Sequence, residues 1–186
     1  HAVLEVVNTP NLSMGPKIRE FENAFQKYTG FKHAIGVNSG TSGLHLCMRA
    51  IDIQPGDIVI TTPFSFVAST NVILFENGIP VYVDVDPKPG NMDTDQVSLA
   101  VTDLMNSASS ASRWLPEKGG QGNGHLKAIL PVDVFGQPAD YDPIRQICDR
   151  YGLALVEDSC EALGAEYKGR KAGTLGDFGV FAFSPN

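Results

Sequence analysis

The chain has 186 residues, of which 42% are hydrophobic and 19% charged, and this composition suits a globular domain with a sizeable core. Its 14 Lys and Arg against 21 Asp and Glu give a formal net charge of −7, and without a basic cluster we expect no nucleic-acid partner. No apolar run reaches the roughly 18 residues that span a bilayer, and no signal-peptide pattern opens the chain, so we expect no membrane association.

Helical and extended patterns alternate along the chain. Ile18, Phe21, Phe25 and Tyr28 recur at helical spacing and predict a helix over Pro16–Thr29, which Gly30 is placed to end. Further helices are expected at 42–51, 66–76, 93–103 (capped by Asp93 or Thr94) and 141–151, strands at 33–37, 58–61, 80–83, 127–132, 153–157 and 179–183, and a hairpin within 167–173.

This alternation predicts an α/β fold with a mainly parallel sheet flanked by helices. Residues 106–124 are rich in Ser and Gly, and we expect a flexible loop insertion without a chemical role there. In parallel sheets ligands bind beyond the carboxyl ends of the strands, so polar residues at those ends are the candidates for function.

The turn at residues 38–43 (NSGTSG) lies between a predicted strand and a predicted helix. Gly40 lets the backbone approach a ligand closely, and the hydroxyls of Thr41 and Ser42 lie at the positive end of the helix dipole. The turn is therefore either a phosphate-binding cradle or an ordinary helix cap, and its sequence leaves both open. It is neither a P-loop nor a dinucleotide-binding fingerprint.

Two further candidates follow strands. Asp158 ends the apolar run LALVED, where a carboxylate can keep a pyridinium nitrogen protonated, although a helix cap or a magnesium-binding acid is also compatible with it. Phe66 lies in TTPFSFVAS and can offer a flat face to a planar ring, or it can be a core residue.

No metal site is expected, because the histidines and the three cysteines lack metal-ligand spacing. The unpaired, widely spaced cysteines favour a reduced, cytoplasmic location.

Taken together and in order, five segments resemble the DegT/DnrJ/EryC1/StrS family of sugar aminotransferases, which use pyridoxal 5'-phosphate (PLP) and have the fold of type I PLP enzymes, as in aspartate aminotransferase. The segments are GPKIREFE (15–22), VNSGTSGLHL (37–46), TPFSFVASTN (62–71), PVDVFGQPAD (131–140) and VEDSCEALGAEYKGRKAGTLGDFG (156–179). The resemblance implies that residues 1–186 form the N-terminal part of the PLP-binding large domain.

The resemblance also assigns roles to individual positions. Gly40, Thr41 and Ser42 would hold the cofactor phosphate. Phe66 would stack on the pyridine ring, and Asp158 would pair with its nitrogen. Glu161 stands where the family usually has Gln near the ring's phenolic oxygen, and a protonated Glu can donate the same hydrogen bond. Where the family has a second phosphate-binding Ser this chain has Ala182, and Ser184 is a weak substitute.

From this register we expect a fragment that stops just before the Schiff-base lysine, which would follow Asn186 directly. The C-terminal small domain would then be missing, and this piece alone would not catalyse transamination. The whole protein is expected to be a homodimer that moves an amino group from an amino acid, with glutamate the expected donor, to a keto-sugar on a nucleoside diphosphate, in amino-sugar, polysaccharide or natural-product biosynthesis.

Three other interpretations remain open on the sequence. A dehydratase of the same family would have His in place of the lysine. A non-catalytic regulator would bind PLP or sugar without turnover. An unrelated α/β nucleotide-binding domain would leave Asp158 and Phe66 without a shared ligand.

Overall fold

The structure, a computed structural model, describes residues 1–106, 108–116 and 124–183. The chain divides into two compact units, His1–Asn38 and Ser39–Asn186. The first unit contains α1 (Ala2–Val7) and α2 (Pro16–Thr29). Pro16 occupies the first turn of α2 and Gly30 ends it in the left-handed conformation with φ 80°, so the predicted bounds of this helix are confirmed.

The strand predicted at 33–37 is wrong, because this segment pairs with no strand among the described residues. It is extended within the first unit, where the N–H of Gly36 donates to the Glu22 carboxylate at 2.8 Å. The Gly36 N–H therefore has a side-chain acceptor on α2 in place of the carbonyl of a neighbouring strand.

The second unit is built on a five-stranded parallel sheet, which confirms the predicted α/β architecture. The strand order is β2-β1-β3-β4-β7. The bounds are β1 (Ile58–Thr61), β2 (Ile79–Tyr82), β3 (Leu126–Ile129), β4 (Ala154–Asp158) and β7 (Phe178–Val180).

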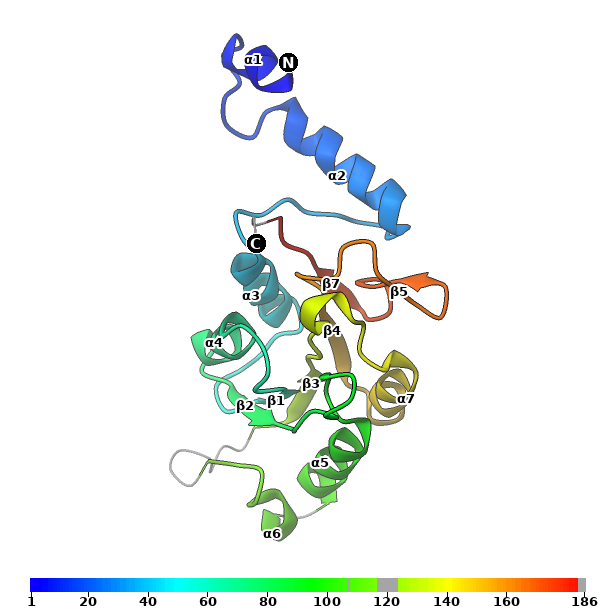
Figure 1. Cartoon of the computed structure of the whole chain (residues 1–186). Coiled ribbons are helices and arrows are strands. Elements are labelled where there is room, and N and C mark those ends of the chain that lie inside the picture. The colour runs from blue at the N-terminus through cyan, green and yellow to red at the C-terminus, as the bar shows by residue number, and fades with distance from the viewer. Residues whose placement is uncertain (107, 117–123, 184–186) are drawn as a thin grey trace. The chain divides into compact units, whose positions relative to one another are not determined.

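Helices cover both faces of this sheet (Figure 1). On one face α3 (Gly40–Ala50) and α4 (Ala68–Phe75) pack against strand residues such as Val59 and Val156. On the other face α5 (Thr94–Asn106) and α7 (Tyr141–Tyr151) pack against Ile60 and Leu155. Successive strand residues thus alternate between two apolar clusters, as a sheet buried on both faces requires. Within the described residues, no helix is long and apolar enough to cross a membrane.

Most predicted elements differ from the observed ones only at their ends. Helix α3 begins at Gly40, two residues before the predicted start, because the side chain of Ser39 caps it by accepting the Ser42 N–H at 3.1 Å. Asp93 caps α5 through the N–H of Asp95 and Gln96. The last strand ends at Val180, short of the predicted 183, and residues 184–186, including Ser184, lie outside the described residues.

The segment predicted as a flexible loop, 106–124, contains a short helix, α6 (Ala108–Ala111), and a following turn. Trp114 and Leu115 pack against the cluster under α5, and the Trp114 indole N–H donates to Asp103 at 2.8 Å. The apolar pair therefore anchors residues 108–116 despite their Ser-rich composition. Residues 107 and 117–123 lie outside the described residues.

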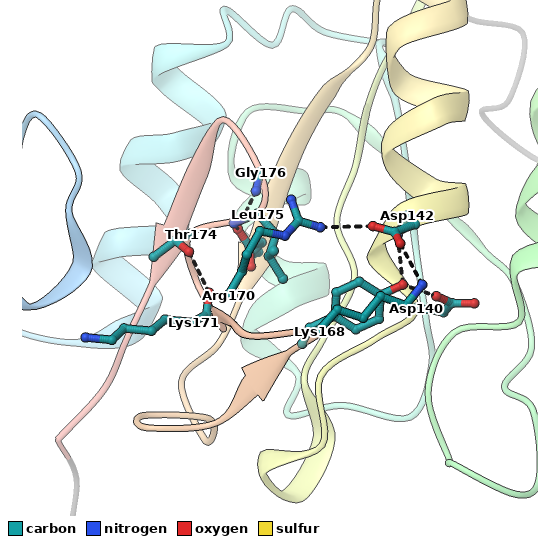
Figure 2. A network of polar contacts seen from close by, with 10 residues as sticks. Asp140, Asp142, Lys168, Arg170, Lys171, Thr174, Leu175 and Gly176 are labelled. Atoms are coloured by element: carbon teal, nitrogen blue, oxygen red, sulfur yellow. Dashed lines mark hydrogen bonds and ion pairs between the residues drawn. The ribbon is translucent and has the colours of Figure 1, made fainter.

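The predicted hairpin is present as the antiparallel pair β5 (Glu166–Tyr167) and β6 (Arg170–Lys171). Figure 2 shows Asp142, near the start of α7, accepting from Lys168 at 2.6 Å and from Arg170 at 2.9 Å. These ion pairs attach the hairpin to α7, on the sheet face away from α3 and α4.

Candidate functional site

The carboxyl end of β4 presents two acidic residues to opposite faces of the sheet. Leu155 belongs to the cluster under α5 and α7 and Val156 to the cluster under α3 and α4, so strand alternation places Asp158 on the α3/α4 face. The Oδ2 of Asp158 accepts the hydroxyl of Ser69, on α4, at 2.7 Å. Asp158 is 6% exposed and thus opens only slightly to solvent at the sheet edge.

Phe66 lies in the turn between β1 and α4 and is connected to Asp158 through Ser69. The backbone N–H of Ser69 donates to the carbonyl of Phe66 at 3.3 Å. The hydroxyl of Ser65 lies 2.7 Å from that of Ser69 and also donates to the Phe66 carbonyl. Phe66 itself is 77% exposed, so its ring belongs to neither apolar cluster. The interpretation of Phe66 as a core residue is therefore wrong.

The N-terminus of α3 has donors that remain available to a ligand. Within residues 1–106, 108–116 and 124–183, the N–H groups of Gly40 and Thr41 have no acceptor. The Ser42 N–H is taken by Ser39, whose hydroxyl also donates to the Ser42 hydroxyl at 3.0 Å. An anion here would meet two free N–H groups, nearby hydroxyls and the positive end of the helix dipole.

This turn and Asp158 lie at the same edge of the sheet. A Cβ on Gly40 would be 2.8 Å from the Sγ of Cys160 and 3.4 Å from the Cβ of Ala182, so no larger residue fits there without displacement. Cys160 follows Asp158 by two residues, and its N–H lies 3.4 Å from the Asp158 carboxylate. The structure thus brings together the turn, Asp158 and Phe66, three features that the sequence predicted separately.

Glu161 lies at the same end of β4 and is exposed. Its Oε2 accepts the backbone N–H of Phe135 at 2.7 Å, within the short 3-10 turn η1 (Val134–Gly136). One carboxylate oxygen of Glu161 is thus an acceptor for the loop that follows β3. Ala182, the residue in place of the family's second phosphate-binding Ser, lies beside Gly40 and offers no hydroxyl.

Asp133 is a buried acid of this region to which the sequence assigned no role. It accepts hydrogen bonds from Ser159 at 2.6 Å, from Tyr141 at 2.7 Å and from the N–H of Ala139 at 3.0 Å. Burial raises the pKa of Asp133, and these donors offset part of that rise. The backbone N–H of Asp133 also donates to the carbonyl of Asp158 at 3.0 Å, which ties the two loops together.

Sequence patterns miss such partners because the residues lie far apart in the chain. Ser69 stands inside the quoted TPFSFVASTN segment, but nothing local indicates that its acceptor is 89 residues away. Asp133 stands inside PVDVFGQPAD, where an acid after an apolar strand was the available signal.

The donor set fits a flat cofactor that carries both a phosphate and a ring nitrogen. The helix N-terminus suits the phosphate, and an oriented, mostly buried carboxylate suits a protonated nitrogen. Because Gly40 has no side chain, a phosphate can approach the backbone closely at this turn. Within a parallel α/β sheet, these features fit the class of PLP-binding enzymes.

Comparison with family models identifies one family over the full chain. The model of the DegT/DnrJ/EryC1/StrS aminotransferase family matches residues 1–186, and the chain belongs to this family. It is 39% identical over 185 residues to the GDP-perosamine synthase of Caulobacter vibrioides, covering 99% of this chain and 44% of that protein. It is 38% identical over 174 residues to a putative pyridoxal phosphate-dependent aminotransferase of Bacillus subtilis, covering 93% of this chain and 41% of the relative.

Solved structures agree with this membership. A putative sugar aminotransferase from Streptococcus pneumoniae in its PLP form superposes with a TM-score of 0.80 at 28% identity, covering 98% of this chain and 45% of that one. A GDP-4-keto-6-deoxymannose-3-dehydratase with a trapped PLP-glutamate adduct gives 0.75 at 28% identity, covering 91% and 40%. The expected fold of type I PLP enzymes is confirmed by these neighbours. The chain spans less than half the length of the relatives it matches.

Proposed function

We propose that the protein containing this chain transfers an amino group from glutamate to a keto-sugar carried on a nucleoside diphosphate, with PLP as cofactor. The observation that carries the proposal is the hydrogen bond from the Ser69 hydroxyl to the Asp158 carboxylate at 2.7 Å. This bond orients the carboxylate at the sheet edge that also holds the Phe66 turn and the N-terminus of α3. The sugar substrate is supported by the relatives' names, GDP-perosamine synthase among them.

Each predicted residue has a place in this proposal. The N–H groups of Gly40 and Thr41, with the Thr41 and Ser42 hydroxyls, hold the phosphate. Phe66 would stack its exposed ring on the face of the pyridine. Glu161, in its protonated form, would donate a hydrogen bond to the ring's phenolic oxygen.

Asp158 holds a proton on the ring nitrogen. When bound, the cofactor supplies an electron sink for negative charge that develops at the reacting carbon, and this sink works best with the nitrogen protonated. Burial excludes water from the pair, and the Ser69 hydroxyl keeps one carboxylate oxygen in position. The chain's own contribution is therefore to bind, orient and maintain a proton at one atom.

The proton-transfer base would come from outside this chain. We propose that a lysine directly after Asn186 provides it. A sugar dehydratase is the second candidate, because a dehydratase is among the structural neighbours. The two differ at one residue, since Lys at that position supports the aminotransferase and His supports the dehydratase.

We also propose a cytoplasmic homodimer. Helix α1 contains no buried residue and exposes Val3, Leu4 and Val7, which is the kind of surface that a second copy covers. Cys47, Cys148 and Cys160 are all unpaired, as in a reduced compartment.

The test uses the full-length protein loaded with PLP. Glutamate alone should shift the visible absorption band, because the donor half of the reaction needs no sugar. Adding GDP-4-keto-6-deoxymannose, or another nucleotide-linked keto-sugar from a panel, should restore the band and yield an amino-sugar, measured by mass spectrometry. A band unchanged by glutamate, or a product that has lost oxygen without gaining nitrogen, contradicts the proposal.

A further inference from the structure

The turn η1 holds an aromatic residue in an unfavourable backbone conformation. Phe135 has φ 53° and ψ 28°, in the left-handed region, and Gly136 follows with φ 82°. Left-handed geometry is cheap for Gly and tolerated by Asn, but it is unfavourable for a bulky side chain. Strain of this kind persists only where the surroundings enforce it, and it gathers at functional sites.

Two hydrogen bonds hold the conformation of this turn, one to a side-chain carboxylate and one to a backbone carbonyl. Glu161 accepts the N–H of Phe135 at 2.7 Å, and the carbonyl of Asp133 accepts the N–H of Gly136 at 3.2 Å. The Asp133 side chain is itself fixed by Tyr141 and Ser159. The turn is therefore attached to the segment that carries Asp158 and Glu161.

The strain is not offset by burial of the ring. Phe135 is 81% exposed and belongs to neither apolar cluster. Its ring meets Phe64 edge to face, with centroids 5.8 Å apart and planes at 87°. Phe64 is 45% exposed and precedes Phe66 by two residues, so this aromatic pair, Phe64 and Phe135, lies at the edge of the sheet that holds the proposed site.

We propose that Phe135, supported by Phe64, is a specificity-determining residue that offers its ring to the C–H face of the acceptor's sugar. The inference rests on the proposed function. The electron-rich face of an aromatic ring attracts the weakly positive hydrogens of a C–H surface, and this adds to the apolar area buried. Phe66 is assigned to the cofactor ring, and Phe135, whose backbone N–H donates to Glu161, offers a second exposed aromatic ring to the substrate.

The test compares Phe135→Gly with wild type in the full-length, PLP-loaded protein. Glycine relieves the left-handed strain and removes the ring, so the melting temperature should stay the same or rise while KM for the nucleotide-linked keto-sugar rises about ten-fold. Phe135→Tyr keeps the aromatic face and should hold KM within about two-fold. The glutamate half-reaction should be unchanged in both variants.

A matched control is Asn77→Gly, because Asn77 is also exposed and left-handed, with φ 55°, but lies after α4. It should leave KM for the sugar unchanged. An unchanged sugar KM in Phe135→Gly would overturn the inference. So would a melting temperature lower by more than about 5 °C or a change in oligomeric mass, because either would make Phe135 a packing or interface residue. Equal weakening of binding by the nucleoside diphosphate alone would assign the ring to the nucleotide and also reject the sugar contact.

Failure of the proposed function is a separate result. It would appear as a wild-type protein whose absorption band ignores glutamate or which aminates no sugar in the panel. A wild type that completes both half-reactions, with a Phe135→Gly variant equal to it, rejects only the inference about Phe135.

Discussion

Glu157 and Asp158 are neighbours on β4, yet the structure uses them in different ways. Glu157 accepts three backbone N–H groups, from Gly173 at 2.8 Å, from Leu175 at 2.5 Å and from Gly176. The Asp158 carboxylate accepts the Ser69 hydroxyl at 2.7 Å and has only a long contact, 3.4 Å, with the Cys160 N–H. Both are nearly inaccessible to solvent.

The difference shows that burial alone does not identify a functional carboxylate. All donors to Glu157 come from the loop before β7, so this acid closes the α5/α7 face of the sheet and fixes the loop. Asp158 keeps hydrogen-bonding capacity, is linked through Ser69 to the backbone of the exposed Phe66, and lies at the same sheet edge as a helix N-terminus with free donors. A ligand requires a polar group that has hydrogen-bonding capacity left and that lies at an accessible edge of the fold.

The largest effect expected from this comparison is on stability. Glu157→Ala would leave three N–H groups, two buried and one partly buried, without an acceptor and should lower the free energy of unfolding by about 3–5 kcal/mol. Urea denaturation of the cofactor-free, full-length protein measures it, because bound cofactor would add its own stabilisation. A loss below about 1 kcal/mol would mean that water replaces the carboxylate and that the loop is not fixed by Glu157.

The pH dependence of the same residue is nearly as large. Burial raises the pKa of Glu157 from 4.5 to about 7, so the folded protein binds a proton that the unfolded chain has released between these values. Stability should therefore fall as pH rises from about 4.5 to 7, by about 3 kcal/mol from this residue. Burial also raises the pKa of Asp133, so Asp133 contributes to the pH dependence of stability with the same sign. The contribution of Glu157 must therefore be isolated with a variant.

Glu157→Gln provides that isolation, because the amide resembles the protonated acid and does not titrate. The difference in unfolding free energy between wild type and Glu157→Gln, measured by urea denaturation at pH 5 and pH 8, should shift in favour of the variant as pH rises. A difference independent of pH would contradict the raised pKa.

Asp158→Asn should affect turnover strongly and stability little, the opposite of what is expected for Glu157→Ala. The amide is isosteric and can still accept from Ser69, so stability should change by less than about 1 kcal/mol. Turnover should fall by about 100-fold or more, since the ring nitrogen loses its anionic partner. Steady-state kinetics of the full-length enzyme check this prediction, and intact turnover would remove Asp158 from the proposed site.

The smallest effect is expected for Ser69→Ala. Removing one hydroxyl donor should disorder the Asp158 carboxylate and reduce turnover by up to about ten-fold. Ser69→Thr keeps the hydroxyl and should restore most activity, whereas Ser65→Ala, one step further from Asp158, should have a weaker effect. The pH titration of the cofactor's visible band separates this positioning role from a loss of packing, because packing defects would not move its midpoint.

Local signals explain which parts of the fold could be predicted. The bounds of α2 and α7 were correct because Pro16, Gly30 and Gly152 act within their own helices. Strand β1 was correct because a short run of β-branched residues (IVIT) between turn residues has few alternatives. The predicted strand at 33–37 failed because pairing depends on a neighbour that no local pattern specifies.

For this protein, local order along the chain was sufficient to determine the parallel α/β architecture, the glycine-containing turn at Gly40 and the acid at the end of β4. Periodicity and strand-end positions depend only on residues a few places apart. The tertiary structure alone decided that Ser69 orients Asp158, that Glu157 is committed to a loop, and that Phe135 is held left-handed by Glu161. These contacts join segments 16 to 89 residues apart, and only the packed sheet and helices bring such segments within hydrogen-bond distance.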